Sequence, residues 1–326
     1  MRPLSALVVT HRGGALLRRC LDALAPQLEP GDALLVAVSA APGQADLSAC
    51  EAHKARVIPL GSNIGFARAA NAGLRETRGA VLLLNDDTRP MEGFVAALRQ
   101  AAADPGLYQP RILLADGSGR LDNTGHGLFP DGFNWARGRE DADGASYDRA
   151  SEVGACSGAA MLITREVLDA IGPFDEDLEA FGEDVDLSLR ARRAGFRLRY
   201  VPSARIEHEL GATYGRYNAR KVYLVERNRV RAAVRSMPAT ALLSMPAWTG
   251  LRLVALAAAS RAGRGWSARV EPGAARAALS GMAAGLFLVP EALGKRRRDA
   301  SAWTIGEREM WAHLLEHRVR VRDLLR

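Results

Sequence analysis

Four short apolar runs, each followed directly by a polar loop, constrain the fold of this chain more than any other feature. They span residues 4–9, 33–38, 57–60 and 81–84. Continuous apolar runs of this length are typical of parallel strands that are buried on both faces. Apolar residues at helical spacing follow the first and third runs. Strand, polar loop and helix in this order predict a doubly wound α/β half, whose strands deliver ligand-binding loops at their carboxyl ends.

The fourth run ends in Asn85-Asp86-Asp87. Two adjacent carboxylates repel each other, so they destabilise the end of a buried strand unless a cation or a hydrogen-bond donor meets them. Such oxygen ligands suit Mg²⁺ or Mn²⁺, which commonly bridge protein carboxylates to substrate phosphates. The alternative is a plain turn in which Asp87 caps a helix beginning near Pro90. On this motif alone the two interpretations are equally good.

The pattern becomes less regular in the middle of the chain. Gly- and Asp-rich sequence over 110–149 predicts hairpins and a flexible flap. A strand is predicted over 159–164 and a helix over 183–194. Two short strands follow, over 196–201 and 205–208.

The helix over 183–194 opens with Glu183 and Asp184. A helix N-terminus favours ionised carboxylates, and an ionised carboxylate that faces a cleft can accept the proton of an attacking hydroxyl. The alternative is the ordinary preference of helix N-termini for acids. Asp186 is expected to face elsewhere and to be solvated. His208 follows a predicted strand, and a lone histidine is more often structural than a ligand.

Several segments together resemble the family 2 glycosyltransferases of GT-A fold. In chain order they are Val8–Thr10, Asn63–Asn71, Leu84–Thr88, Ser157–Leu162, Gly172–Glu176 and Phe181–Asp186, followed by Arg193–Phe196 and His208. The resemblance covers roughly residues 4–235 and is greatest to the rhamnosyltransferase-like bacterial branch that builds surface polysaccharides. It implies an α/β fold with a doubly wound mixed sheet, a GT-A catalytic domain over 1–235 and a basic helical C-terminal region over 236–326.

The resemblance also implies a role for each matching position. Asp87 would bind a divalent metal, Mg²⁺ or Mn²⁺, with His208 as a further contact. Asp184 would be the general base, and Glu183 would hold the acceptor. The implied nucleotide-sugar contacts are Thr10, Arg12, Asn63, Arg68, Asn85, Asp86 and Gly158. At Gly158 the missing side chain would let backbone N–H groups approach the acceptor or the diphosphate.

These roles imply an inverting transfer of a hexosyl or rhamnosyl group from a nucleotide-diphosphate sugar to a hydroxyl acceptor. Surface polysaccharide or glycolipid synthesis, with a lipid-linked acceptor, would be the setting. One departure concerns the nucleobase: the family usually has an acidic residue after the second strand, where this chain has Ser39-Ala40-Ala41. Uridine, thymidine and guanosine donors therefore stay open.

Two other functions compete with this one. A sugar nucleotidyltransferase would share the fold and the metal, but Thr10–Gly14 is a poor version of its phosphate-binding loop. The other is a basic membrane- or nucleic-acid-binding module without catalysis. Two further features stay open: Arg227–Arg229 is a phosphate-facing pair or a solvated helix face, and Trp135 stacks on a sugar or anchors a turn.

The net charge of +7 is unevenly distributed. Residues 1–235 contain 30 basic and 30 acidic residues, whereas 236–326 contain 14 and 7. No nucleic-acid-binding motif accompanies this charge, so no nucleic-acid partner is expected. The C-terminal region, with its basic cluster Lys295–Arg298, either lies on an anionic membrane surface or packs on the catalytic domain.

No membrane span is expected, because Pro246 and Arg252 interrupt the best apolar run before it reaches roughly 18 residues. The N-terminal run also lacks the features of a signal peptide. Three cysteines without close spacing predict neither disulfides nor a zinc site. The expected location is therefore the cytoplasm, at the inner face of the plasma membrane if the C-terminal region binds lipid.

Overall fold

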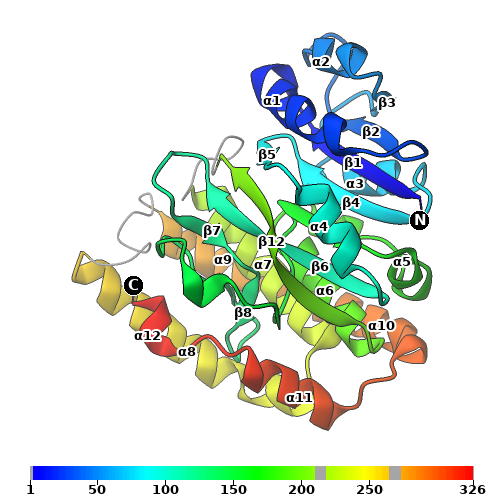
Figure 1. Cartoon of the computed structure of the whole chain (residues 1–326). Helices are drawn as coiled ribbons and strands as arrows, with labels where there is room; N and C mark the ends of the chain where they lie inside the picture. Colours follow the sequence, from blue (N-terminus) through cyan, green and yellow to red (C-terminus); the bar gives the residue numbers. More distant parts are fainter. Residues whose placement is uncertain (1–2, 210–217, 264–272, 326) are drawn as a thin grey trace.

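The computed structural model describes residues 3–209, 218–263 and 273–325, and a ten-stranded mixed sheet forms its centre (Figure 1). The strand order is β10-β12-β6-β11-β4-β1-β2-β3, with β5 on β12 and β7 on β6, while β8 and β9 form a separate hairpin. The strands are β1 Leu4–Thr10, β2 Ala33–Val38, β3 Arg56–Pro59, β4 Ala80–Asn85, β5 Thr88–Pro90, β6 Gly106–Leu114, β7 Leu121–Asn123, β8 His126–Leu128, β9 Asn134–Ala136, β10 Ser151–Glu152, β11 Ala160–Ile163 and β12 Arg197–His208.

Helices cover the sheet and continue beyond it into the C-terminal region. They are α1 Gly14–Leu24, α2 Ser48–Ala52, α3 Phe66–Leu74, α4 Phe94–Ala101, α5 Arg165–Ile171, α6 Glu183–Arg193, α7 Ala219–Ser236, α8 Ala239–Arg261, α9 Ala274–Phe287, α10 Val289–Asp299, α11 Glu307–Glu316 and α12 Val321–Leu324. The predicted α/β class, with its helical C-terminal region, is confirmed.

Different helices cover the two faces of the sheet, because side chains alternate along each strand. In β1, Leu4, Ala6 and Val8 join one core with α1, α2 and α4. Leu7 and Val9 join the opposite core with α3, α5 and α6. Burial on both faces explains why the strand reads as a continuous apolar run.

Strand pairing brings three polar chain segments to one edge of the sheet. β4 is parallel to β1, with Asn85 opposite Val9, so these strands end side by side. β5 is antiparallel to β12, which places Thr88 opposite His208. The sheet therefore brings the Asn85–Asp87 segment and His208 together, although more than 100 residues separate them in the chain.

Three predictions about secondary structure were wrong. Residues 110–114 belong to β6, which is buried throughout. The neighbouring strand β11 pairs with β6 only as far as Tyr108, so the missing N–H of Pro110 breaks no hydrogen bond to β11. The strands predicted over 196–201 and 205–208 form one strand, with a register shift between Val201 and Arg205. The helix expected near Pro90 begins only at Phe94, so Asp87 does not cap it.

The expectation that Asp186 is solvated was also wrong. Its side chain is buried and lies 2.8 Å from Arg190 Nε and 3.1 Å from Arg235 Nη1. Arg235 comes from α7, which packs on α6, so only the tertiary structure supplies this partner. The Asp186 carboxylate thus helps to hold α6 against α7.

The C-terminal helices pack against the domain that contains the sheet. Met310 and Leu314 of α11 share a core with Leu128 and Leu189. A buried ion-pair network makes a second connection: Arg252 of α8 lies 2.7 Å from Glu226 and 2.8 Å from Asp131. The division into domains at residue 235 stays a prediction.

Helix α8 is long and apolar enough to cross a membrane, contrary to the expectation from the sequence. It has 23 residues and a mean hydropathy of 1.4, and only 17% of its apolar window is buried. Pro246 lies inside the helix without ending it, and the charge of Arg252 is neutralised within the protein. Among the described residues, α9 and α10 pass the same test only as a pair, and they are bent by 54°.

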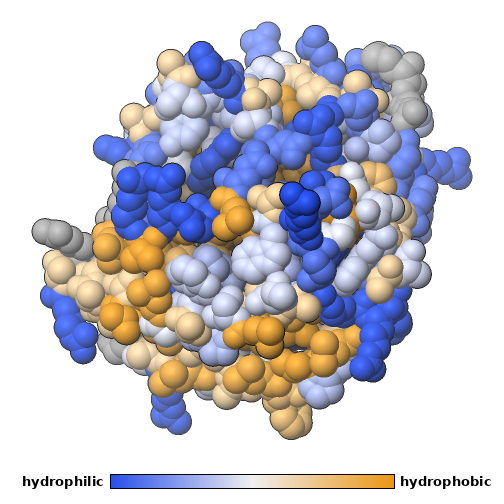
Figure 2. Space-filling view, turned by 90° about the horizontal axis from the view of Figure 1, so that it is seen from below, coloured by the Kyte–Doolittle hydropathy of each residue, from blue (hydrophilic) through white to orange (hydrophobic). Residues whose placement is uncertain are grey.

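The outer side of these helices presents apolar side chains to solvent. Seen from below, the molecule shows a broad hydrophobic area (Figure 2). Seven of the ten exposed large hydrophobic side chains of the described chain belong to α8, α9 and α10: Leu243, Leu251, Val254, Leu279, Leu286, Phe287 and Leu293. The C-terminal region is thus packed on one side and unpartnered on the other.

We expect His313 to make the stability of this packing depend on pH. Its Nε2 lies 3.0 Å from the carbonyl oxygen of Gly154, and burial lowers its pKa from 6.5 to about 4. Between pH 4 and pH 6.5, His313 therefore binds a proton in the unfolded chain but not in the folded chain. The resulting stability is present above pH 6.5 and is lost as the pH falls toward 4, by up to about 3 kcal/mol. In His313→Gln, thermal unfolding followed from pH 7 to 4.5 should show a smaller loss than wild type. The half-exposed His53 offers the control His53→Gln, and equal losses in all three proteins would contradict the prediction.

Candidate active site

A cleft of about 420 Å³ lies at the edge of the sheet where β1, β4 and β12 end. Nine of the eleven site positions predicted from the sequence line it: Thr10, Asn63, Asn85, Asp86, Asp87, Gly158, Glu183, Asp184 and His208. These residues come from six separate segments of the chain. The fold therefore gathers most of the predicted site in one place.

The histidine at the end of β12 lies between two carboxylates. His208 Nδ1 is 2.8 Å from Asp122 Oδ2, and His208 Nε2 is 3.3 Å from Asp87 Oδ1. Burial opposes the charged imidazole, but the two carboxylates outweigh it and raise the pKa of His208 to about 10. Asp122, which sequence reasoning missed, fixes the orientation of this ring.

Three buried oxygens in the cleft make no well-formed hydrogen bond with the described residues, although the His208 imidazole lies 3.3 Å from Asp87 Oδ1. They are Asn85 Oδ1, Asp87 Oδ1 and Glu183 Oε2. Buried oxygens without donors are costly in a folded protein. The first two lie on the segment expected to meet a metal and a diphosphate.

The residues beside Asp87 fit a divalent cation that is shared with a substrate. The described chain contains no group of three or more His, Cys, Asp or Glu residues that could hold a metal ion by themselves. Mg²⁺ is usually bound through one or two carboxylates together with substrate phosphates. Asp87 is a carboxylate of this kind. His208 next to it could join as a ligand only after losing its proton, because a protonated imidazole has no free lone pair.

The second carboxylate of the Asn-Asp-Asp motif is held by the end of β1. The Thr10 hydroxyl donates to Asp86 Oδ2, and the Gly13 N–H donates to Thr10 Oγ1 at 2.8 Å. Burial raises the pKa of Asp86 to about 6. Thr10 and Asp86 thus form one rigid unit on the floor of the cleft.

The loop with Asn63 is tied to the end of β2. Ser39 Oγ accepts a hydrogen bond from the Ile64 N–H at 2.9 Å and donates to Asn63 Oδ1 at 3.4 Å. Ser39 stands where the resemblance leads one to expect an acid. It holds the loop next to the cleft, and both residues line it.

The acidic pair at the start of α6 has two different environments. The Gly158 N–H donates to Asp184 Oδ2 at 2.8 Å, and the Val185 N–H donates to Asp184 Oδ1 at 2.8 Å. Glu183 is buried, and burial followed by the nearby Asp184 charge raises its pKa well above the usual range. The pair therefore combines an oriented carboxylate with a carboxyl group that favours its protonated form.

Comparison with known proteins identifies the family. Residues 2–234 match the family described as Glycosyltransferase like family 2. This protein belongs to that family. This membership favours glycosyl transfer, and neither the nucleotidyltransferase nor the non-catalytic interpretation gains support.

Similar proteins agree with this assignment. An uncharacterized protein of Mycobacterium tuberculosis (strain ATCC 25618 / H37Rv) is 34% identical over 167 residues, which are 47% of this chain and 57% of that protein. The chain thus matches little more than half of that relative. The N-acetylglucosaminyl-diphospho-decaprenol L-rhamnosyltransferase of the same strain is 30% identical over 241 residues, 65% of this chain and 78% of that enzyme. The resemblance to the rhamnosyltransferase-like branch is thereby confirmed.

A solved structure confirms the GT-A fold. GalNAc-T7, crystallised with UDP, GalNAc and Mn²⁺, superposes with a TM-score of 0.55 at 14% sequence identity. The match covers 72% of this chain and 48% of that one. At this identity the likeness concerns the fold alone.

Two of the predicted contacts lie outside the cleft, and the N–H of a third is hydrogen-bonded within the protein. Arg12 and Arg68 do not line the cleft; Arg12 is exposed, and Arg68 lies on the outer side of α3, 3.9 Å from Glu176. Phe66 at the start of α3 faces the cleft, and two residues further along a helix points to nearly the opposite side. The Gly158 N–H donates to Asp184, so it could meet the acceptor or the diphosphate only by exchanging this bond, and its role stays a prediction.

Several residues that line the cleft were not predicted. Besides Asp122 these include His11, His126, Phe181 and Lys221. The Lys221 ammonium lies 5.0 Å from the centre of the Phe181 ring, and burial lowers its pKa to about 8. Their only sequence signal is proximity to recognised motifs, which does not reveal the direction of a side chain.

The two features left open in the sequence have different outcomes. Trp135 lines the cleft, as a sugar-stacking role requires. Arg227–Arg229 neither face a phosphate site nor form a solvated surface. Asn228 Nδ2 lies within 3.0 Å of the carbonyl oxygens of three residues over 178–181, and Arg229 is buried 2.9 Å from Glu226. The segment connects α7 to the loop before α6.

We expect Asp122→Asn to weaken binding of Mn²⁺ in the presence of a nucleoside diphosphate by about 10- to 100-fold. Loss of the carboxylate that orients a metal-binding histidine typically has this effect. Calorimetric titration with Mn²⁺ measures it. Asp22→Asn is a matched control, because Asp22 forms an exposed pair with His53 at 2.6 Å. Equal affinities of the Asp122 variant and wild type would contradict a positioning role for Asp122.

Proposed function

We propose that this glycosyltransferase is an inverting, metal-dependent enzyme that moves a hexosyl or rhamnosyl group from a nucleotide-diphosphate sugar to a hydroxyl acceptor. The observation that carries the proposal is that one cleft contains both the Asp87–His208 pair and Asp184. The leaving group departs from the donor sugar, and the acceptor hydroxyl that loses its proton attacks the same anomeric carbon, so the side chains that serve the two must face a common space.

The donor binds along the ends of β1, β2 and β4 in this proposal. Thr10 and Asp86 form a fixed polar floor, while Ser39 holds Asn63 beside it. Asp87 and His208 would hold Mg²⁺ or Mn²⁺ next to the diphosphate. When bound, such a cation offsets the negative charge of the departing nucleoside diphosphate, an effect worth several kcal/mol.

Asp184 is the proposed general base. Two backbone N–H groups orient its carboxylate, which stays only partly exposed to the cleft. Removing the acceptor proton as the hydroxyl attacks the sugar opposite the leaving group inverts the anomeric carbon. Glu183 in its protonated form can donate a hydrogen bond to the acceptor.

The acceptor and the biological setting are proposed from the relatives. The printed name of the mycobacterial rhamnosyltransferase describes an acceptor in which a sugar is joined through diphosphate to decaprenol. We assign this protein an acceptor of the same lipid-linked kind and a role in surface polysaccharide or glycolipid synthesis. A lipid-linked acceptor places the enzyme at a membrane surface.

We expect Asp184→Asn to lower transfer by about 10²- to 10⁴-fold, because an amide cannot act as the base. Binding of the nucleotide sugar with Mn²⁺ should survive, as measured by thermal stabilisation of the protein. Asp169→Asn, at an exposed position of α5, is the control. Undiminished turnover in the Asp184 variant would remove this residue from the mechanism.

The same assay tests the metal dependence and distinguishes an inverting from a retaining mechanism. Donor hydrolysis and transfer should stop when a chelator removes the metal and return when Mn²⁺ is added. The product of an inverting enzyme has the opposite anomeric configuration to the donor, which proton NMR reads directly. A product that retains the donor configuration would refute the role of Asp184 as base.

The C-terminal region is the proposed membrane contact. Leu243, Val254 and Phe287 are 84%, 68% and 84% exposed on the outer side of the helices. Arg261, Arg276, Arg297 and Arg298 are exposed in the same region. Buried apolar area and basic residues at about 1 kcal/mol each together favour an anionic lipid surface. Because Arg252 ties α8 to the catalytic domain, we propose that α8 lies in the interface and does not span the bilayer.

We expect the protein to co-sediment with phosphatidylglycerol vesicles at low salt and much less with phosphatidylcholine vesicles. The double variant Leu243→Glu/Phe287→Glu should bind at least tenfold more weakly, because it places charge on the apolar surface. Met91→Glu is the control, since Met91 is also exposed but lies outside the C-terminal region. If the wild-type protein failed to bind anionic vesicles, the proposal that the apolar side of the C-terminal region contacts a membrane would be contradicted.

A further inference from the structure

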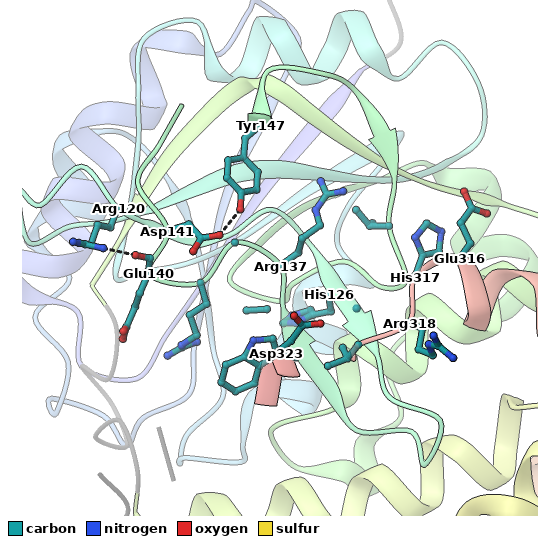
Figure 3. Close-up of a pocket in the computed structure, with 18 residues that line it drawn as sticks. Arg120, His126, Arg137, Glu140, Asp141, Tyr147, Glu316, His317, Arg318 and Asp323 are labelled. Carbon is teal, nitrogen blue, oxygen red and sulfur yellow. Dashed lines mark hydrogen bonds between the residues drawn. The ribbon is translucent and has the colours of Figure 1, made fainter. Parts of the chain in front are cut away.

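A second cavity of about 600 Å³ adjoins the donor cleft (Figure 3). One wall is the β8–β9 hairpin with the residues that follow it, including Arg137, Glu140 and Asp141. The facing wall is the C-terminal segment over 316–323. Neither wall belongs to the elements expected to bind the nucleotide sugar.

Backbone hydrogen bonds hold the C-terminal wall in place. The Leu128 N–H donates to the carbonyl oxygen of His317 at 2.9 Å, and the Val319 N–H donates to that of Leu128 at 2.9 Å. Gly127 permits this approach, because a Cβ there would lie 2.9 Å from Val319 Cγ2. The wall therefore forms through the backbone and leaves the side chains of Glu316 and Arg318 available to the cavity.

The cavity shares part of its lining with the cleft that contains the proposed reaction centre. His126, Trp135, Ala136 and Arg139 line both spaces. His126 Nε2 lies 3.9 Å from Asp184 Oδ2. A molecule that occupies the second cavity can thus extend past His126 and Trp135 to place a hydroxyl at the general base.

The lining is polar, and its formal charges are balanced. Four guanidinium groups and four carboxyl groups surround the space: Arg120, Arg137, Arg139 and Arg318 with Glu140, Asp141, Glu316 and Asp323. A site for a phosphate would be expected to carry an excess of cations. A sugar presents neighbouring hydroxyls that both donate and accept, which matches interspersed guanidinium and carboxyl groups.

Two features supply binding capacity for such a ligand. Trp135 offers an aromatic surface at the junction of the two spaces, and aromatic rings combine a large apolar face with polar edges. The Arg318 side chain is exposed and has no partner within the described part of the chain. The volume lies within the range of small-molecule sites.

We propose that this second cavity binds the sugar portion of the acceptor, and that the C-terminal segment over 316–323 is therefore part of acceptor recognition. The inference rests on the proposed function, because it assigns the acceptor side of the same reaction. It also separates the two substrates: the donor occupies the cleft at the strand ends, and the acceptor sugar enters from the opposite side of His126.

The test uses the full chain with saturating Mn²⁺ and a mixture of UDP, TDP and GDP to fill the donor cleft. Methyl glycosides of glucose, mannose, rhamnose and N-acetylglucosamine serve as probes in saturation-transfer NMR. We expect at least one glycoside to bind under these conditions. Arg318→Ala and Glu316→Ala should each weaken it about tenfold or more, because each removes a charged hydrogen-bonding group. Arg308→Ala, at another exposed arginine in α11, should bind like wild type.

Several results would overturn the inference. These are the absence of glycoside binding, binding that the nucleoside diphosphates abolish, and unchanged binding in both cavity variants. Displacement of the glycoside by inorganic pyrophosphate would identify an anion site instead. Mn²⁺-dependent hydrolysis of nucleotide sugars, measured on the same proteins, keeps the two proposals separate. Its absence in wild type contradicts the proposed function, whereas normal hydrolysis in both variants with lost glycoside binding supports the acceptor site.

Discussion

The crowding of carboxyl groups in one cleft is the constraint on which the rest of the site depends. Six lie along it: Asp86, Asp87, Asp122, Glu183, Asp184 and Glu226. A threonine hydroxyl meets Asp86, and one imidazole lies between Asp87 and Asp122. Glu183 favours its protonated form, backbone N–H groups meet Asp184, and buried arginines meet Glu226. Asp87 Oδ1 has only the imidazole 3.3 Å away and no well-formed hydrogen bond, and the proposed cation and diphosphate would meet it.

The C-terminal region connects this chemistry to its surroundings. On its inner side, α11 and the segment after it complete the wall of the second cavity, and buried arginines tie the helices to the catalytic domain. On its outer side, apolar and basic residues are exposed. A membrane-bound acceptor would then meet one continuous structure, with lipid contact outside and sugar recognition inside.

Much of the fold follows from local pattern. Because β1, β2 and β4 are buried on both faces, their apolar runs predict the strands almost to the residue. The acidic motifs likewise stand out because carboxylates are costly at buried strand and helix ends unless something meets them. Prediction failed at β6, where Pro110 suggested a turn, and at Asp186, whose partner Arg235 lies 49 residues away.

The sequence by itself determined the strand and helix order, the carboxylates of the site and the uneven distribution of charge. These depend on periodicity and composition, which are local. Only the tertiary structure decided that Asp122 orients His208, that Arg68 faces away, and that the C-terminal segment lines the second cavity. Side-chain direction and contacts between distant segments depend on packing across the sheet, and no local pattern encodes them.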